Sequence, residues 1–198
     1  MIKYSNGQNF TKIPAKSPQL SKKSNSFSHG NRGMNLESDI NLSNEFYKQK
    51  KLCLITKRPT PINVVKVDYT KGATITSAYF EKQSTTDYNG VWNGRYIDFE
   101  AKSTQKTTSF PLSNISHHQI EHLKNVLLHK GIAFFIIEFA KPNKVYLLDA
   151  KYVIDFYENS IRKSIPYDQV VIHGHEIKKG YLPRLNYLDV IDKIYVKS

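Results

Sequence analysis

Two carboxylates and a lysine lie close together in the middle of the chain, at Asp87, Glu100 and Lys102. In residues 96–102 polar and apolar side chains alternate, which predicts a β-strand with Glu100 and Lys102 on one face. Magnesium prefers oxygen ligands and keeps several waters, so one or two carboxylates are enough to hold it. A lysine beside them can offset negative charge that develops on a phosphate. The three residues therefore suit metal-dependent hydrolysis of a phosphodiester.

A turn must bring Asp87 back to this strand. Asn89-Gly90 and Asn93-Gly94 are both turn dipeptides that suit hairpin connections. A hairpin here would place Asp87 beside Glu100, while the apolar face of residues 96–102 packs on a core. A simpler alternative fits the same residues, because Glu-x-Lys is a short and common pattern that also occurs as solvated neighbours on a surface strand.

Charge and composition narrow the class of protein. The 198 residues are enough for one domain with an arm or insertion, and the net charge of +12 favours polyanions, with nucleic acid ahead of an anionic membrane surface. Cys53 is the only cysteine, which excludes an intramolecular disulfide and a zinc site built from several cysteines. No apolar N-terminal stretch resembles a signal peptide, and the longest apolar run, residues 132–137, is too short to span a bilayer. We therefore expect a cytoplasmic protein with no membrane contact.

The first 32 residues differ from the rest of the chain. They contain five lysines and Arg32 but no acidic residue, and they are rich in Ser, Asn, Gln and Pro. This composition predicts a flexible, disordered basic arm, followed by a single domain over residues 33–198. The arm is either a sequence-independent phosphate contact or a tail without a role.

The pattern of residues 34–47 predicts a helix with an apolar stripe. Glu37 lies in its first turn, where the helix dipole stabilises a negative charge. Alternating residues around 62–69 and 75–79 predict a β-hairpin that turns near residues 70–72. Lys57 and Arg58 lie at its base. The pattern fits an inserted hairpin and an ordinary sheet edge equally well.

Further elements follow the central strand. Residues 103–112 are expected to be a polar loop, and residues 164–184 a looser region. Ser116 and Gln119 have the spacing of a helix capping box. The other predicted elements are helices at 116–130, closed by Gly131, at 150–163 and at 185–195, and strands at 52–56, 132–139 and 145–148.

Several blocks of the sequence resemble the RecU family of bacterial Holliday junction resolvases, which belongs to the PD-(D/E)xK nuclease class. The resemblance runs from about Arg32 to residues 183–185. It departs from the class name in having Thr86, not proline, before Asp87. The matching blocks are Ser84-Thr85-Thr86-Asp87-Tyr88-Asn89-Gly90, Tyr96-Ile97-Asp98-Phe99-Glu100-Ala101-Lys102, Thr108-Ser109-Phe110-Pro111-Leu112, His118-Gln119, Lys57-Arg58-Pro59-Thr60-Pro61 and Asn31-Arg32-Gly33-Met34.

The resemblance implies an α/β fold with a central mixed β-sheet flanked by helices, similar to restriction endonucleases, with a β-hairpin stalk inserted at about residues 57–79. It implies a structure-selective, Mg²⁺-dependent endonuclease that resolves Holliday junctions by paired symmetric nicks in recombination and repair. The implied partners are four-way junction DNA, a second copy of the chain in a homodimer, and the recombinase RecA.

The resemblance also assigns residues. Asp87 and Glu100 would hold the metal, and Thr85 and Gln119 would complete its coordination shell. For Gln119 two roles are left open, because it could be a metal ligand or the capping residue of its helix. Lys102 would be catalytic, and by likeness to the wider nuclease class Glu37 is a candidate outer ligand. The basic residues expected to contact DNA are Arg32, Lys57, Arg58 and Lys71.

Two other functions remain. One is a nuclease acting on other branched or linear duplex DNA, against which the stalk and the arm count. The other is a catalytically silent junction-binding protein that modulates recombination. The presence of Asp87, Glu100 and Lys102 together counts against silence, because a binding module has no need for all three.

Overall fold

The computed structural model describes residues 30–70, 72–80 and 85–196, with the backbone alone for residues 30–35. Its centre is a six-stranded sheet. In this sheet β5 and β7 are parallel and the other described pairs are antiparallel, so the sheet is mixed, as expected. The strands, in spatial order, are β1 (Leu54–Lys57), β4 (Tyr88–Trp92), β5 (Arg95–Thr104), β7 (Ile132–Phe139), β8 (Lys144–Asp149) and β10 (Gly174–Glu176).

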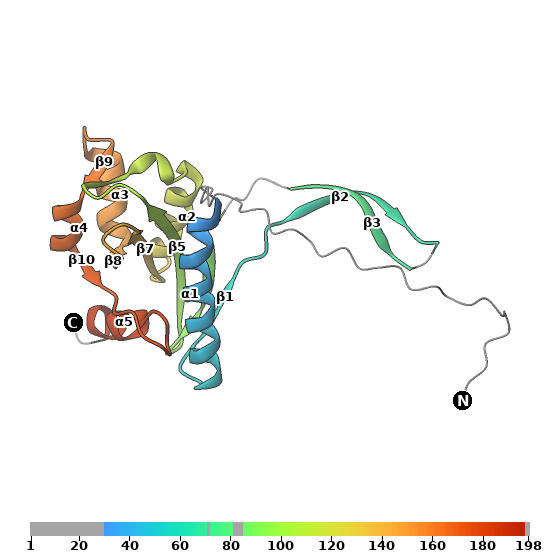
Figure 1. The fold of residues 1–198 in the computed structure, drawn as a ribbon, viewed down its shortest axis with the longest axis horizontal. Helices are drawn as coiled ribbons and strands as arrows, with labels where there is room; N and C mark the ends of the chain where they lie inside the picture. Colours follow the sequence, from blue (N-terminus) through green and yellow to red (C-terminus); the bar gives the residue numbers. More distant parts are fainter. Residues whose placement is uncertain (1–29, 71, 81–84, 197–198) are drawn as a thin grey trace, which may run out of the picture.

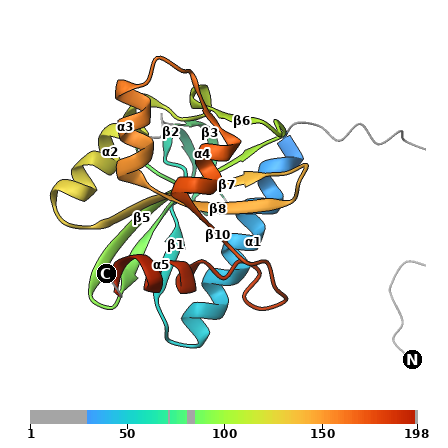
Figure 2. The ribbon, with the colours of Figure 1, turned by 90° about the vertical axis from the view of Figure 1, so that its left-hand side faces the viewer.

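Helices cover both faces of this sheet (Figure 2). On one face α1 (Gly30–Gln49) and α5 (Tyr187–Tyr195) pack on the apolar side chains of β5. The other face carries α2 (His117–Leu128), α3 (Ala150–Asn159) and α4 (Tyr167–His173). Every residue of β7 is buried, because its alternate side chains enter the two cores. The α/β class predicted from sequence is confirmed.

The predicted hairpin is present as β2 (Ile62–Asp68) and β3 (Thr74–Phe80), which form a two-stranded sheet of their own. Figure 1 shows it projecting from the body as a stalk. The sheet-edge alternative is therefore wrong. A register shift after Val64 leaves Val65 without an opposite residue, which explains the broken alternation in the sequence at this point.

The two turn dipeptides have different roles. Asn93 and Gly94 have positive φ of 48° and 73°, and they join β4 to β5 as predicted. Asn89-Gly90 was also predicted as a turn, but it lies inside β4. A Cβ on Gly90 would lie 2.0 Å from the Leu54 carbonyl oxygen, so the glycine allows β1 to approach β4 closely.

Other elements differ from the prediction in extent. The region at 164–184 contains β9 (Ser164–Pro166), α4 and β10, and the predicted polar loop contains the end of β5, then β6 (Ser109–Pro111) and the start of the short 3-10 helix η1 (Leu112–Asn114). Short strands and helices of this kind carry little periodicity. The helix predicted over 150–163 ends at Asn159, and Lys130, not Gly131, takes the left-handed conformation after α2.

The predicted basic arm lies outside the described residues, apart from the backbone of residues 30–32, which belongs to α1. Cys53 is half-buried against the core that α1 and α5 cover, and its burial raises the pKa of the thiol to about 11. No helix in the described part of the chain is long and apolar enough to cross a membrane.

Candidate active site

The β4–β5 hairpin brings Asp87 to Glu100. Tyr88 pairs with Phe99, so the residue before β4 lies beside the one after Phe99. The Asp87 backbone N–H donates a hydrogen bond to Glu100 Oε2 at 3.1 Å. The proximity expected from the sequence is therefore present.

The Glu100 carboxylate is buried and incompletely satisfied. Only 1% of its side chain is exposed, and Lys102 Nζ lies 2.8 Å from Oε1 as an ion pair. The direction of that contact does not make a hydrogen bond, so Oε1 is a buried oxygen without one. Burial, and then the negative charge of Asp87, raise the pKa of Glu100 to about 8, against the opposing effect of Lys102. A cation placed here would relieve both causes.

These residues fit a divalent cation. Glu100 offers an oxygen without a hydrogen bond, and Asp87 supplies a second carboxylate on the adjoining segment. Within the described ranges no group of three or more His, Cys, Asp or Glu side chains is arranged to hold a metal. The remaining ligands would therefore be neutral oxygens or water, which is the usual environment of Mg²⁺.

Gln119, one of the predicted ligands, is buried, and its Oε1 accepts a hydrogen bond from the Ser116 backbone N–H at 3.0 Å. The capping interaction is therefore made, while the ligand role stays a prediction. Thr85 is partly buried and precedes Thr86 and Asp87 in a segment outside the strands.

Glu37, the candidate outer ligand, lies on α1 near β4. Its backbone carbonyl accepts a hydrogen bond from the Tyr88 hydroxyl at 3.3 Å. Its carboxylate forms an ion pair with Lys57, one of the predicted DNA contacts.

The second described basic residue, Arg58, is also engaged within the protein. It forms an ion pair with Asp98, and 21% of its side chain is exposed. Lys71 lies outside the described residues, and only the backbone of Arg32 is described.

The sequence reasoning did not include Asp98 in the site. Its side chain is fully buried, and four side chains contact its carboxylate. Burial alone would raise the pKa of Asp98, but hydrogen bonds from His122, Thr86 and Tyr96 and the charge of Arg58 lower it overall. The contacts come from Arg58 Nη2, Thr86 Oγ1, Tyr96 OH at 2.8 Å and His122 Nε2 at 2.9 Å.

The sequence contains one indication that Asp98 belongs near the site. It lies on the same face of the strand as Glu100, and a buried face that carries two carboxylates must supply partners for both. Its partners could not be foreseen, because they come from the residue after β1, the segment before β4, the start of β5 and α2.

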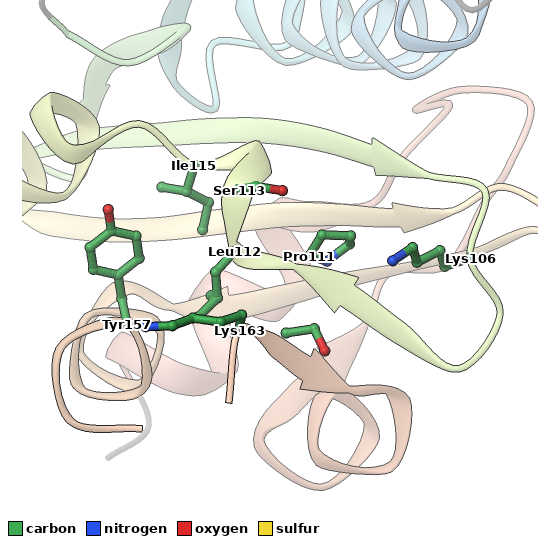
Figure 3. A pocket seen from close by; sticks show the side chains of 8 residues that line it. Lys106, Pro111, Leu112, Ser113, Ile115, Tyr157 and Lys163 are labelled. Atoms are coloured by element: carbon green, nitrogen blue, oxygen red, sulfur yellow. The ribbon is translucent and has the colours of Figure 1, made fainter. Parts of the chain in front are cut away.

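A cavity of about 620 Å³ lies elsewhere, beside η1 and β9 (Figure 3). None of the predicted site residues lines it, so the candidate active site is a carboxylate cluster at β5 and not this cavity. The residues that line it are Lys106, Pro111, Leu112, Ser113, Ile115, Tyr157, Lys163 and Ser164.

We compared the chain with models of known protein families. The family model of Recombination protein U, RecU, matches residues 31–193. This range includes every described element from β1 to β10 and nearly all of α1 and α5. This chain belongs to the RecU family. Asp87, Glu100, Lys102 and Asp98 all lie within the matched range.

Named RecU proteins are similar over most of their length. "Holliday junction resolvase RecU" of Geobacillus sp. (strain WCH70) is 51% identical over 172 residues, covering 84% of this chain and 86% of that protein. The RecU of Bacillus cytotoxicus is 46% identical over 199 residues, covering 98% of each chain. Among solved structures, the Archaeoglobus fulgidus Holliday junction resolvase Hjc is a distant likeness, with a TM-score of 0.44 and 12% identity over 72% of this chain and 94% of Hjc.

Proposed function

We propose that this RecU-family chain is a structure-selective, Mg²⁺-dependent DNA endonuclease that resolves Holliday junctions by paired symmetric nicks during homologous recombination and repair. The observation that carries the proposal is the buried Glu100 oxygen without a hydrogen bond, beside Asp87 and Lys102. The names of its relatives supply the substrate class.

In this proposal Asp87 and Glu100 hold the metal, and Thr85 and Gln119 complete its shell. A bound Mg²⁺ supplies Lewis-acid chemistry to the scissile phosphate. Lys102 carries an ammonium 2.8 Å from the Glu100 carboxylate, so its positive charge would offset negative charge that develops on a phosphate bound beside Glu100. Glu37 is an outer residue that contacts the site through the ligand-bearing segment.

DNA binding would be divided among several parts of the chain. A basic arm over residues 1–32, whose last three residues belong to α1, would contact phosphate without sequence preference, and residues 33–198 would be a single nuclease domain with the stalk at about 57–79. The stalk projects from the body, which suits entry into the open centre of a four-way junction through shape alone. The basic residues proposed to contact phosphate are Arg32, Lys57, Arg58 and Lys71.

The proposed assembly is a homodimer in the bacterial cytoplasm. Two-fold symmetry would place two sites on opposed strands of a near-symmetric junction. The recombinase RecA is the proposed regulatory partner. A silent binding protein is disfavoured, because Glu100 lies beside both Asp87 and Lys102, and a binding module has no need for all three.

The deciding experiment offers the purified protein a synthetic four-way junction and a linear duplex, each with Mg²⁺ and with EDTA. We expect cleavage of the junction with Mg²⁺ only, as nicks at symmetric positions in two opposed strands. Equal cleavage of the duplex would favour the alternative of a general DNA nuclease. Junction binding without cleavage in any divalent metal would favour the silent modulator.

The stalk has its own test. Replacing residues 70–74 with an Asn-Gly turn shortens the tip while leaving β4 and β5 in place, so we expect junction affinity to fall far more than duplex affinity. The matched control is Lys71→Ala, which removes one charge without shortening the stalk and should therefore lower the junction-to-duplex affinity ratio far less than the shortened tip does. Competitive binding at fixed salt measures the ratio, and an unchanged ratio in a folded variant would leave selectivity to other surfaces.

A further inference from the structure

Asp98 links three elements that meet at the candidate site. Arg58 follows β1 at the base of the stalk, and Thr86 precedes β4. His122 lies on α2, three residues after Gln119. One fully buried carboxylate therefore contacts the stalk base, the segment that carries Asp87 and the helix that carries Gln119.

Two of these partners hold the main chain of Asp87. Arg58 donates its backbone N–H to the Asp87 carbonyl oxygen at 2.7 Å, while its guanidinium is fixed on Asp98. Thr86 is bonded to Asp87 in the chain, and its hydroxyl donates to Asp98 Oδ1. The Asp87 N–H points the other way, to Glu100 Oε2. Asp87 lies just before β4, so the Arg58 bond extends the β1–β4 pairing by one residue, and the Thr86 contact with Asp98 fixes the segment beyond it.

We propose that Asp98 is a positioning residue for the metal site: by fixing Arg58 and Thr86 it holds the Asp87 main chain against Glu100. The inference rests on the proposed function, because positioning matters only if Asp87 and Glu100 share a cation. Residues that orient ligands in this way typically change metal affinity by about 10- to 100-fold when they are altered. In this proposal Asp98 acts through Arg58 and Thr86 and is not itself a ligand.

A stability measurement alone cannot test this role. Removing the charge of Asp98 leaves Arg58 partly buried without its counter-charge, and Arg58 Nε already has no hydrogen-bond partner. Asp98→Asn could therefore fail to fold for reasons unrelated to the metal. Thr86→Val is the milder variant, because it removes one hydroxyl at nearly constant shape and leaves the Arg58–Asp98 pair intact.

Matched controls lie outside the set of residues that contact Asp98. Ser43→Ala also removes a fully buried hydroxyl, one that donates to the Asp39 carbonyl oxygen at 2.7 Å on α1. Glu138→Gln neutralises a second buried carboxylate of the sheet, whose partners are Ser103 at 2.9 Å and Lys179 at 3.2 Å. Both controls should affect stability without moving Asp87.

The experiment has two readouts on the full chain without DNA. Mn²⁺ binding is measured by titration calorimetry, and hydrogen exchange of the Asp87 amide is measured in EDTA. We expect Thr86→Val and folded Asp98→Asn to weaken Mn²⁺ binding by about tenfold or more and to speed amide exchange, whereas Ser43→Ala and Glu138→Gln change neither by more than about twofold. Junction binding in EDTA should stay at the wild-type level in Thr86→Val, Ser43→Ala and Glu138→Gln, none of which alters a residue proposed to contact DNA or its ion pair.

The outcomes separate the two proposals. Wild-type amide exchange and wild-type Mn²⁺ affinity in folded Thr86→Val would overturn the positioning role and leave the proposed function standing. If the wild-type protein bound no Mn²⁺ and cut no DNA, the proposed function would fail. Amide exchange in the same variants would then decide whether Asp98 holds Asp87.

Discussion

Asp98 and Glu100 lie two residues apart on the same face of β5, and both side chains are buried, yet their surroundings are opposite. Asp98 receives four donors, and the pKa of its carboxyl is lowered in spite of burial. Glu100 has a buried oxygen without a hydrogen bond, and its pKa is raised to about 8 by burial and by Asp87. Asp98 accepts hydrogen bonds on both oxygens, whereas Glu100 accepts one hydrogen bond on Oε2 and has only the Lys102 ion pair at Oε1. Burial alone therefore does not distinguish the two carboxylates, whereas the donors that surround each of them do.

The largest expected effect is on catalysis. Glu100→Ala and Asp87→Ala should each reduce junction cleavage to background, because the chemistry needs the metal. Junction binding in EDTA should persist, since it rests on many phosphate contacts. Parallel cleavage and gel-shift assays measure the two, with Glu121→Ala on the exposed face of α2 as the control. A Glu100 variant that cuts at the wild-type rate would remove this residue from the site.

Asp98→Asn should give the largest loss of stability, about 3–5 kcal/mol in the free energy of unfolding, because it leaves the charge of Arg58 uncompensated. Urea unfolding measures it. The control is Glu121→Gln, which breaks an exposed pair with Lys124 and should cost at most about 1 kcal/mol. A loss no larger than that of the control would mean that Asp98 is not satisfied in the way its contacts indicate.

Glu100→Gln should raise the free energy of unfolding, the opposite of the effect expected for Asp98→Asn. In EDTA at pH 7 we expect a gain of about 1–3 kcal/mol, because an acid whose folded-state pKa is raised destabilises the fold above its unfolded-state pKa. The contribution of Glu100 is fully present below its ordinary pKa of 4.5 and is lost as the pH rises to about 8. Over that interval the wild type should lose stability relative to the variant. Parallel stability curves with pH would contradict the raised pKa.

The smallest effect concerns Gln119, whose oxygen already accepts a hydrogen bond, as the oxygens of Asp98 do. Gln119→Ala should cost about 1 kcal/mol or less through the lost cap. Gln119→Glu keeps the capping box but adds a charge, so a changed Mg²⁺ dependence of cleavage would assign Gln119 to the metal shell. An unchanged Mg²⁺ titration would leave it as a cap alone.

The sequence predicted what depends on local pattern. The period-2 alternation and Asn93-Gly94 predicted the hairpin that brings Asp87 to Glu100. The apolar run at residues 132–139 predicted β7. The turn predicted at Asn89-Gly90 is wrong, because Gly90 is needed where the backbone of β1 approaches β4 closely. The short elements between α3 and α5 were missed because they hold their place by pairing with distant strands, as β10 does with β8.

The candidate site shows the same division. Asp87, Glu100 and Lys102 could be chosen because their spacing is visible along the chain. The partners of Asp98 could not, since Arg58, Thr86 and His122 meet only after three separate segments have packed. The burial that opposes ionisation of Glu100 also depends on this packing, so its raised pKa could not be inferred from residue types.

The separate stalk has a consequence for the order of folding. The chain between Leu54 and Val91, which pair across β1 and β4, contains the whole insertion, so this contact requires closure of a long loop. The stalk is a local hairpin, and hairpins form within microseconds. Once Ile62 lies opposite Phe80, the ends of the insertion are already close together, and only short flanks remain to be ordered. The insertion should therefore slow assembly of the sheet far less than an unstructured linker of the same length.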